Sequence, residues 1–438
     1  MPSSRCAAIR RLRRCVVTAG LATARMIALA IALPIALSIA LAGAAYAEPP
    51  AAAGATAAGT DFGPQVRVMF RVAACGGEDP IPERFSARAI TAHCREMAAI
   101  YGSYRKAWAD EARTFIAALR PRDLPRTVVY PFGGGDLSSA LAVYPDAAEL
   151  TTISLEAAGD IRVIDTIKSA RLDAEVDSIG NEIRRLYYAA HSTTKSLQAA
   201  SHSELPGTIM FALAGLVVHG MEPVTLRYFD LEPDGSLTYL TAAQLEERAA
   251  ALLAKKAGGP PKKITHYWFE QVSAFANVEI GFRPRGELGA PLRIYRHIVA
   301  NLDDNHMSGD DRVLRHLRAK GKVSVMTKAA SFLLWYDDFT QIRDYLLHHT
   351  AWMISDASGI PPSYAEPAGF EQVTYGEFEG PYFIIDDKNT RAEFVKLWRS
   401  QPHRELPFRF GYPDSARHNH LMITRPRVGA APGGAAKR

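Results

Sequence analysis

The most constraining feature of this chain is a segment in which a strand, a glycine turn, a short helix and a second strand follow one another. Residues 127–132 (TVVYPF) are β-branched and aromatic, as buried strands are. Three glycines and Asp136 follow, then an apolar helical stretch at 137–144 and a second strand at 150–155 (LTTISL). Two neighbouring strands joined through a helix lie parallel, with a right-handed crossover. The segment therefore predicts a parallel sheet in an α/β fold.

The rest of the chain places helices before this unit and further strands after it. The spacing of apolar residues predicts two helices between 83 and 119, with a break near Gly102. Residues 209–219 are apolar and fit either a helix or a buried strand. Two hairpins are predicted further along the chain. They pair 224–231 with 236–240 and 277–283 with 292–302.

Two capping boxes predict helix starts in the second half of the chain. Thr241 with Gln244 begins one helix, and Ser308 with Asp311 begins another. A strand, a helix and a strand then follow at 322–326, 340–349 and 351–355. These elements predict an α/β protein with a Rossmann-like, mostly parallel sheet, a helical N-terminal region and added antiparallel hairpins.

The first 47 residues have the pattern of a secretory signal peptide. Six arginines and no acid precede an apolar run at 26–44, and Ala45, Tyr46 and Ala47 form a site suited to a signal peptidase. We expect cleavage near Ala47 and a periplasmic or secreted bacterial protein that keeps no stable membrane span. Retention of the apolar run as an anchor is the alternative, because it is long enough to cross a bilayer.

The leader also accounts for the basic charge of the chain. The whole sequence has 51 Lys and Arg against 46 Asp and Glu, a net charge of +5. Six of the arginines belong to the leader, which leaves 45 basic against 46 acidic side chains in the rest. A body without excess positive charge has no global attraction to nucleic acid, so we exclude nucleic acid as a partner.

Cysteine usage and composition define the remaining organisation. Cys6 and Cys15 lie in the leader, which leaves Cys75 and Cys94. In an exported chain we expect these two to form a disulfide, with two buried thiols as the alternative. The predicted regions are a signal peptide, a flexible linker, one large α/β domain and a disordered tail. Their bounds are 1–47, 48–60, 61–424 and 425–438.

The glycine turn of the first unit is the strongest candidate for a ligand site. Gly133, Gly134 and Gly135 allow a ligand to approach the backbone, and Glu156 follows the second strand. In adenosyl sites a carboxylate at that place accepts from ribose hydroxyls, and the arrangement resembles the first two motifs of class I methyltransferases. Asp136 departs from the dinucleotide fingerprint because its charge repels a pyrophosphate. The alternative interpretation is a tight turn in which Asp136 caps the helix.

Three further candidates follow other predicted strands of the sheet. Lys328 comes after the strand at 322–326, and Asp356 and Ser358 come after the strand at 351–355. Ligands of open α/β sheets bind beyond the carboxyl ends of the strands. We expect Lys328 to hold a carboxylate or phosphate, and Asp356 with Ser358 to bind hydroxyls or supply a base. A surface salt bridge or a turn cap is the alternative for each.

Several stretches together resemble an exported bacterial family. They are YPFGGGDLSSALAVYPDA with SLE, KAASFLL, SDASGIPPSY and FGYPD, where the family reads approximately YPFSGPD, GLEP, KAASYLM and DDSGIP. The family has no established activity, so the resemblance implies an architecture and no chemistry. Gly133 and Gly135 stand where the family has Ser and Pro, and Ala357 replaces an Asp. Catalysis that depended on those groups would be weakened here.

No motif in the sequence names a reaction. The S-x-x-K match at 192–195 lacks its partner motifs, the paired histidines His418 and His420 have no converging ligands, and no metal or cofactor is assigned. We therefore expect an exported protein that binds a polar small molecule or a cell-envelope component at the candidate edge. The alternatives are an enzyme at the same edge and a purely structural envelope partner. The enzyme would be a methyltransferase or a hydrolase with Asp356 as base.

Overall fold

The computed structural model describes residues 59–188, 203–257, 274–380, 388–411 and 419–427. The predicted leader, the linker up to residue 58, the motif at 192–195, His418 and the tail beyond 427 lie outside the described residues. Among the described residues, no helix is long and apolar enough to cross a membrane.

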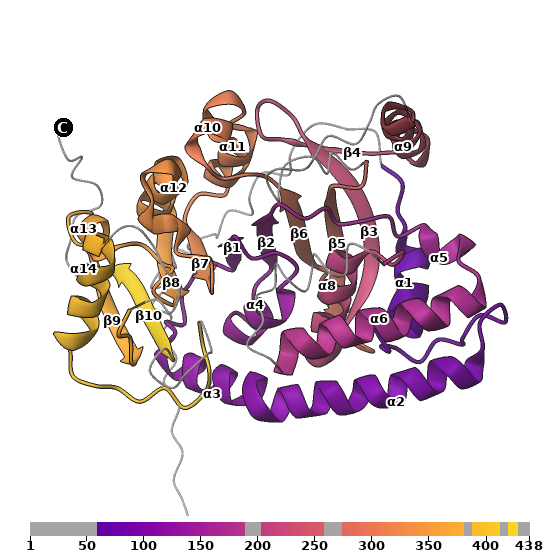
Figure 1. Cartoon of the computed structure of the whole chain (residues 1–438), viewed down its shortest axis with the longest axis horizontal. Coiled ribbons are helices and arrows are strands. Elements are labelled where there is room, and N and C mark those ends of the chain that lie inside the picture. Colours follow the sequence, from indigo (N-terminus) through magenta and orange to yellow (C-terminus); the bar gives the residue numbers. More distant parts are fainter. Residues whose placement is uncertain (1–58, 189–202, 258–273, 381–387, 412–418, 428–438) are drawn as a thin grey trace, which may run out of the picture. The chain divides into compact units, whose positions relative to one another are not determined.

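A ten-stranded sheet organises the part of the chain that the structure describes (Figure 1). Its strands are β1 (Thr127–Pro131), β2 (Glu149–Ser154), β3 (Met221–Leu231), β4 (Leu237–Tyr239), β5 (Asn277–Pro284), β6 (Arg293–Val299), β7 (Val323–Thr327), β8 (Thr350–Ser355), β9 (Phe370–Gly376) and β10 (His420–Pro426). Their order across the sheet is β4-β3-β5-β6-β2-β1-β7-β8-β10-β9.

The sheet is mixed rather than mostly parallel. The central strands β6, β2, β1, β7 and β8 run parallel to one another. Antiparallel pairings join β5, β3 and β4 to one side, and β10 and β9 to the other. The predicted α/β class, the parallel β1–α4–β2 unit and both hairpins are confirmed. The antiparallel share is larger than expected, because β10 inserts between β8 and β9 after a long connection.

Helices cover both faces of the sheet (Figure 1). In β1, Val128 packs on one face and Val129 on the other, as alternation along a strand requires. The core on the Val128 face includes α1, α2, α4, α6 and α8, and the core on the Val129 face includes α10, α11 and α12. The helices are α1 (Gly63–Val72), α2 (Ala87–Tyr104), α3 (Asp110–Leu119), α4 (Leu137–Val143), α5 (Val163–Thr166), α6 (Ser169–Tyr188), α8 (Gly207–Val218), α9 (Ala242–Ala257), α10 (Asp304–Gly309), α11 (Arg312–Ala319), α12 (Thr340–His349), α13 (Pro362–Ala365) and α14 (Lys388–Arg399).

The apolar segment after residue 206 is the helix α8, and it lies in the interior. Nearly every residue in it is buried, which explains why no polar face interrupts its sequence. Gly215 of α8 approaches α4 so closely that a Cβ would lie 2.9 Å from the backbone nitrogen of Ser138. A larger residue there would push α8 away from α4.

The N-terminal helices are continuous where a break was expected near Gly102. The chain passes from α2 through a π-helical turn, Arg105–Ala109, directly into α3. Single π-helical turns within α-helices are rare and occur frequently at functional sites. This turn includes Trp108.

One of the two predicted capping boxes is present and the other is wrong. At α9, the Gln244 amide nitrogen donates to Thr241 Oγ1 over 3.3 Å, and the Thr241 amide donates to Gln244 Oε1 over 2.8 Å. Ser308, by contrast, lies inside α10, and the carboxylate of Asp311 pairs with Arg315 instead. The sequence pattern spans two short helices there, so it does not mark one helix start.

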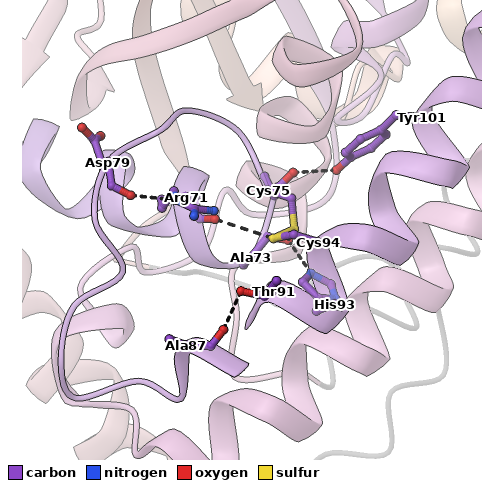
Figure 2. Close-up of a disulfide and its surroundings, with 10 residues drawn as sticks. Arg71, Ala73, Cys75, Asp79, Ala87, Thr91, His93, Cys94 and Tyr101 are labelled. Atoms are coloured by element: carbon purple, nitrogen blue, oxygen red, sulfur yellow. Dashed lines mark hydrogen bonds between the residues drawn. A yellow bond between two sulfur atoms is a disulfide. The ribbon is translucent and has the colours of Figure 1, made fainter. Parts of the chain in front are cut away.

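The two remaining cysteines form the predicted disulfide (Figure 2). Cys75 and Cys94 have Cα atoms 5.1 Å apart and join the end of α1 to α2. Two contacts reinforce the same junction. His93 Nε2 lies 2.8 Å from the carbonyl oxygen of Ala73, and the Tyr101 hydroxyl donates to that of Ala74 over 2.9 Å. The bridge is compatible with an extracellular location.

The ordered domain extends slightly beyond its predicted bounds at both ends. Thr60 donates its amide to Leu240 over 3.0 Å, and its hydroxyl accepts from the amide of Ala242. At the other end, Arg425 and Pro426 belong to β10 and pair with β9. The edges of the predicted linker and tail are therefore part of the packed structure.

Candidate functional site

The carboxyl ends of β1 and β7 are neighbours at the middle of the sheet. From β1 the chain passes through α4 to β2 on one side, whereas β7 lies on the other side and leads to β8. The connections after these two strands therefore diverge, which leaves a switch point between them. In open α/β sheets, ligands bind at this position.

The backbone at this switch point is strained. Phe132 follows β1 with φ +63°, and Ala329, Ser331 and Phe332 follow β7 with φ between +50° and +57°. In the described ranges only one other non-glycine residue, Cys75, has positive φ. Such conformations cost of order 1–3 kcal/mol each and cluster at ligand sites.

The predicted glycine turn packs against its own chain. Gly133, Gly134 and Gly135 are all buried, and Gly134 uses its conformational freedom at φ +52°. A Cβ on Gly135 would lie 3.2 Å from the Cβ of Phe211 and from the carbonyl oxygen of Thr208, at the start of α8. These glycines allow the tight turn and the close approach of α8.

Asp136 caps α4 and is the acceptor at the centre of the site. The side chain is only 5% exposed, and one carboxylate oxygen accepts from the amide of Ser139 over 3.1 Å. The other oxygen accepts from the Tyr130 hydroxyl over 3.2 Å and lies 3.7 Å from Nζ of Lys328. The alternative interpretation of Asp136 as a helix cap agrees with these contacts.

Lys328 joins the β7 side of the switch point to the β1 side. Its ammonium donates to the Ser139 hydroxyl over 3.0 Å and lies 5.0 Å from the ring centre of Trp108. The side chain remains 24% exposed. Because Asp136 balances its charge, Lys328 can donate hydrogen bonds to a ligand without demanding an anion.

Three aromatic side chains line this pair, and sequence reasoning missed them. Tyr104 stacks on Trp108 with ring centres 5.4 Å apart and on Tyr187 at 4.1 Å. Tyr104 is buried, and this burial raises the pKa of its hydroxyl well above the usual range. It therefore stays protonated and serves as a neutral hydrogen-bonding group. The only sequence signal was the irregular apolar spacing after Gly102, now explained by the π-helical turn.

Asp356 and Ser358 hold two loops together. Both are fully buried, and the carboxylate of Asp356 accepts from the amides of Ala329 and Ser358 over 2.8 Å each. The Ser358 hydroxyl in turn accepts from the amide of Ala330 over 3.2 Å. Both oxygens of Asp356 are thus engaged by backbone donors. This geometry fixes the strained loop behind Lys328 and disfavours Asp356 as a general base.

Glu156 lies beyond β2 and is not joined to the Asp136–Lys328 pair. Its carbonyl oxygen accepts from Nε2 of His297 over 2.7 Å, and Nδ1 of the same ring lies 3.1 Å from the Thr152 hydroxyl. Burial lowers the pKa of His297 to about 4, so the ring is neutral at pH 7. Within the described ranges, the half-buried carboxylate of Glu156 has neither a hydrogen bond nor an ion pair.

The site therefore combines balanced charge, hydroxyl groups and aromatic rings. Asp136 and Lys328 lie next to each other, and Asp356 and Ser358 bind the backbone of the loop that follows Lys328. Glu156 does not contact this group. Ser139, Lys328 and Asp136 are connected in series, and in this series the buried Ser139 hydroxyl accepts from the Lys328 ammonium. In the described part of the chain, no three His, Cys, Asp or Glu side chains converge as metal ligands would. No protein-family model, curated protein or solved structure matches the chain.

Proposed function

We propose that the chain is an exported protein that binds a neutral, hydroxyl-rich small molecule or cell-envelope fragment between β1 and β7. The observation that carries the proposal is the Asp136–Lys328 pair, which bridges the switch point and leaves the ammonium partly exposed. Hydroxyl groups of a ligand find donors in Lys328 and Tyr104 there. Trp108, with Tyr104 stacked on its ring and Lys328 over it, forms the apolar wall behind these donors.

A Rossmann-like arrangement of the parallel strands is part of this proposal. Without the inserted β3 to β5, the parallel strands follow the order 3-2-1-4-5 of doubly wound nucleotide folds. That order supports a ligand at the β1 and β7 switch point. Export is supported by the predicted signal peptide and is compatible with the Cys75–Cys94 bridge.

The proposal is tested by thermal-shift screening of the protein without its leader against sugars, peptidoglycan fragments, nucleotides and adenosyl compounds. We expect neutral sugar-type compounds to raise the melting temperature, and Lys328→Met to weaken their binding at least about tenfold, as the loss of a charged donor does. Lys322→Met is the matched control, because Lys322 lies before β7 at its opposite end and donates to the His348 carbonyl. Equal binding by both variants would refute the site.

A methyltransferase-like transferase is the second candidate. The strand order and the carboxylate of Glu156 after β2 favour it. The close packing of α8 on Gly135 opposes the methyltransferase candidate, because Thr208 and Phe211 fill the space beside this glycine. Stabilisation by an adenosyl compound that disappears in Glu156→Ala would replace the sugar proposal with this one.

A further inference from the structure

Four arginines gather around α3, the end of α4 and the amino ends of β1, β2 and β6. We call Arg113, Arg120, Arg126 and Arg293 the arginine cluster. Arg120, Arg126 and Arg293 lie at the amino ends of the strands, and Arg113 reaches His219, which contacts Ser138 at the start of α4. The sequence singled out none of the four. Arg113 lies on α3, Arg120 and Arg126 lie in the connection from α3 to β1, and Arg293 begins β6, so the fold brings Arg293 near the other three.

Arg293 is the most buried member of the cluster. Only 8% of it is exposed, its Nε donates to the Ala147 carbonyl over 2.6 Å, and its guanidinium lies 4.9 Å from the ring centre of Phe282. Its Nη2 is buried and has no hydrogen-bond partner among the described residues. Burial and the nearby Arg126 lower its pKa to about 10, and Asp146 offsets only part of this effect.

Arg113 presents a second unsatisfied donor. Its Nη2 lies 2.7 Å from Nδ1 of His219, whereas its buried Nε has no acceptor in the part of the chain that the structure describes. Nε2 of His219 lies 2.8 Å from the Ser138 carbonyl, so the neutral ring donates there and accepts from Arg113. Arg293 also acts on this imidazole electrostatically. Arg113 therefore contacts His219 directly, and Arg293 lies near enough to influence its charge.

The cluster carries more positive charge than its surroundings balance. Asp146 lies 2.7 Å from Arg120, and its backbone oxygen accepts from Arg126 over 2.8 Å. Asp110 lies 3.7 Å from Arg113. These two carboxylates face four guanidinium groups, and no acid contacts Arg293 among the described residues. A buried cation without a partner is costly, so its retention points to a ligand that supplies the missing charge.

We propose that the arginine cluster binds the phosphate group of a small molecule, with Nη2 of Arg293 and Nε of Arg113 as donors that the described residues leave unsatisfied. A phosphate dianion matches the two uncompensated charges, and guanidinium groups are the preferred partners of phosphate oxygens. The phosphate would reach the cluster from the side of Arg113, whose side chain is 39% exposed to solvent. The depth of Arg293 favours a free phosphate compound over a phosphate in a lipid headgroup.

The test is calorimetric titration of the full protein without its leader with inorganic phosphate at low ionic strength. We expect binding that Arg293→Lys and Arg113→Lys each weaken at least about tenfold, because lysine keeps the charge but loses the planar fork. Arg315→Lys is the control, since Arg315 pairs with Asp311 on α11, over the other face of the sheet. Equal affinities in all four proteins, or no binding up to about 10 mM phosphate, would overturn the proposal.

Two further measurements keep the proposal testable if a variant folds poorly. Burial, with smaller contributions from Arg113, Arg293 and Arg105, lowers the pKa of His219 to about 3. Nitrogen NMR of His219 in the unmutated protein is expected to show a higher pKa when phosphate is added, because its negative charge offsets the arginines. An unmoved pKa would contradict the site. Vesicles of phosphatidylglycerol are expected not to bind, and vesicle binding without affinity for inorganic phosphate would overturn the choice of a free phosphate compound.

Discussion

The two polar regions of this protein differ in how their charges are balanced. At the carboxyl edge, Lys328 faces Asp136, hydroxyl and amide groups donate to the carboxylate, and the ammonium stays partly exposed to a ligand. In the arginine cluster, Arg113 and Arg293 keep buried nitrogens that have no acceptor among the described residues. A balanced and satisfied site stabilises the fold and suits a neutral polar ligand. An unbalanced site destabilises the free protein and suits a ligand that brings its own charge.

The largest expected effect is the loss of the acceptor at the balanced site. Asp136→Ala removes a helix cap, the partner of the buried Tyr130 hydroxyl and the counter-charge of Lys328, and we expect a loss of about 4 kcal/mol in the free energy of unfolding. Asp146→Ala, in the arginine cluster, is expected to cost less than about 1 kcal/mol because its side chain is 56% exposed. Urea denaturation measures both. Equal losses would remove the distinction between the regions.

Removal of the disulfide is expected to lower stability without altering either region. The double variant Cys75→Ser with Cys94→Ser frees a short loop in the unfolded chain and should cost about 3 kcal/mol. Neither cysteine contacts the Asp136–Lys328 pair or the arginine cluster, so titrations of the folded variant with a sugar and with phosphate should match the parent protein. A loss of either affinity would link the bridge to a ligand site.

The pH dependence of stability separates the two regions through their buried histidines. The pKa of His297, near the carboxyl edge, is lowered to about 4, and that of His219, beside the arginine cluster, to about 3. Their usual pKa in the unfolded chain is about 6.5, so protons bind the unfolded state more strongly. Stability is complete above pH 6.5 and falls on acidification by up to about 1.4 kcal/mol per pH unit for each ring.

Urea denaturation between pH 4 and 7 checks this assignment. His297→Gln and His219→Gln should each flatten the profile below pH 6.5. In the unmutated protein, phosphate should reduce the pH dependence of the free energy of unfolding. It should act through His219 alone, because the charge of a phosphate in the arginine cluster reaches that ring. Variants with the parent's slope would show that the rings are not held neutral by burial.

The smallest expected change in stability comes from the deletion of a charge in the arginine cluster. Arg293→Met removes a buried cation that has no acidic partner, so we expect the free energy of unfolding to stay within about 1 kcal/mol of the parent value. Lys328→Met should cost more, about 2 kcal/mol, because it leaves Asp136 buried without its cation. A larger loss in Arg293→Met than in Lys328→Met, measured in urea, would reverse the comparison.

Local patterns were sufficient to predict the centre of the fold. The β-branched strand, glycine turn and short helix around Gly133 specify a parallel unit, because the crossover leaves few other solutions. The antiparallel pairing of β10 between β8 and β9 could not be predicted in the same way. Its partners are set by packing across a long connection, and no local pattern encodes them.

The sequence predicted individual residues of the candidate site, but it did not predict which of them lie in contact. Asp136 and Lys328 follow strands, so the carboxyl-edge rule identifies both, but the contact between them depends on β1 and β7 being neighbours. Trp108 comes from a π-helical turn that breaks regular periodicity. Arg293 begins a strand and has no motif around it, so only its burial without an acid identifies it.

The most direct test of the account is a crossed titration with two probes. Diacetylchitobiose represents a neutral hydroxyl-rich ligand and inorganic phosphate represents the anion, and each is titrated into the parent protein, Lys328→Met and Arg293→Lys. The account predicts that Lys328→Met loses affinity for the sugar alone and that Arg293→Lys loses affinity for phosphate alone. Loss of phosphate binding in Lys328→Met, together with unchanged sugar binding, would contradict it.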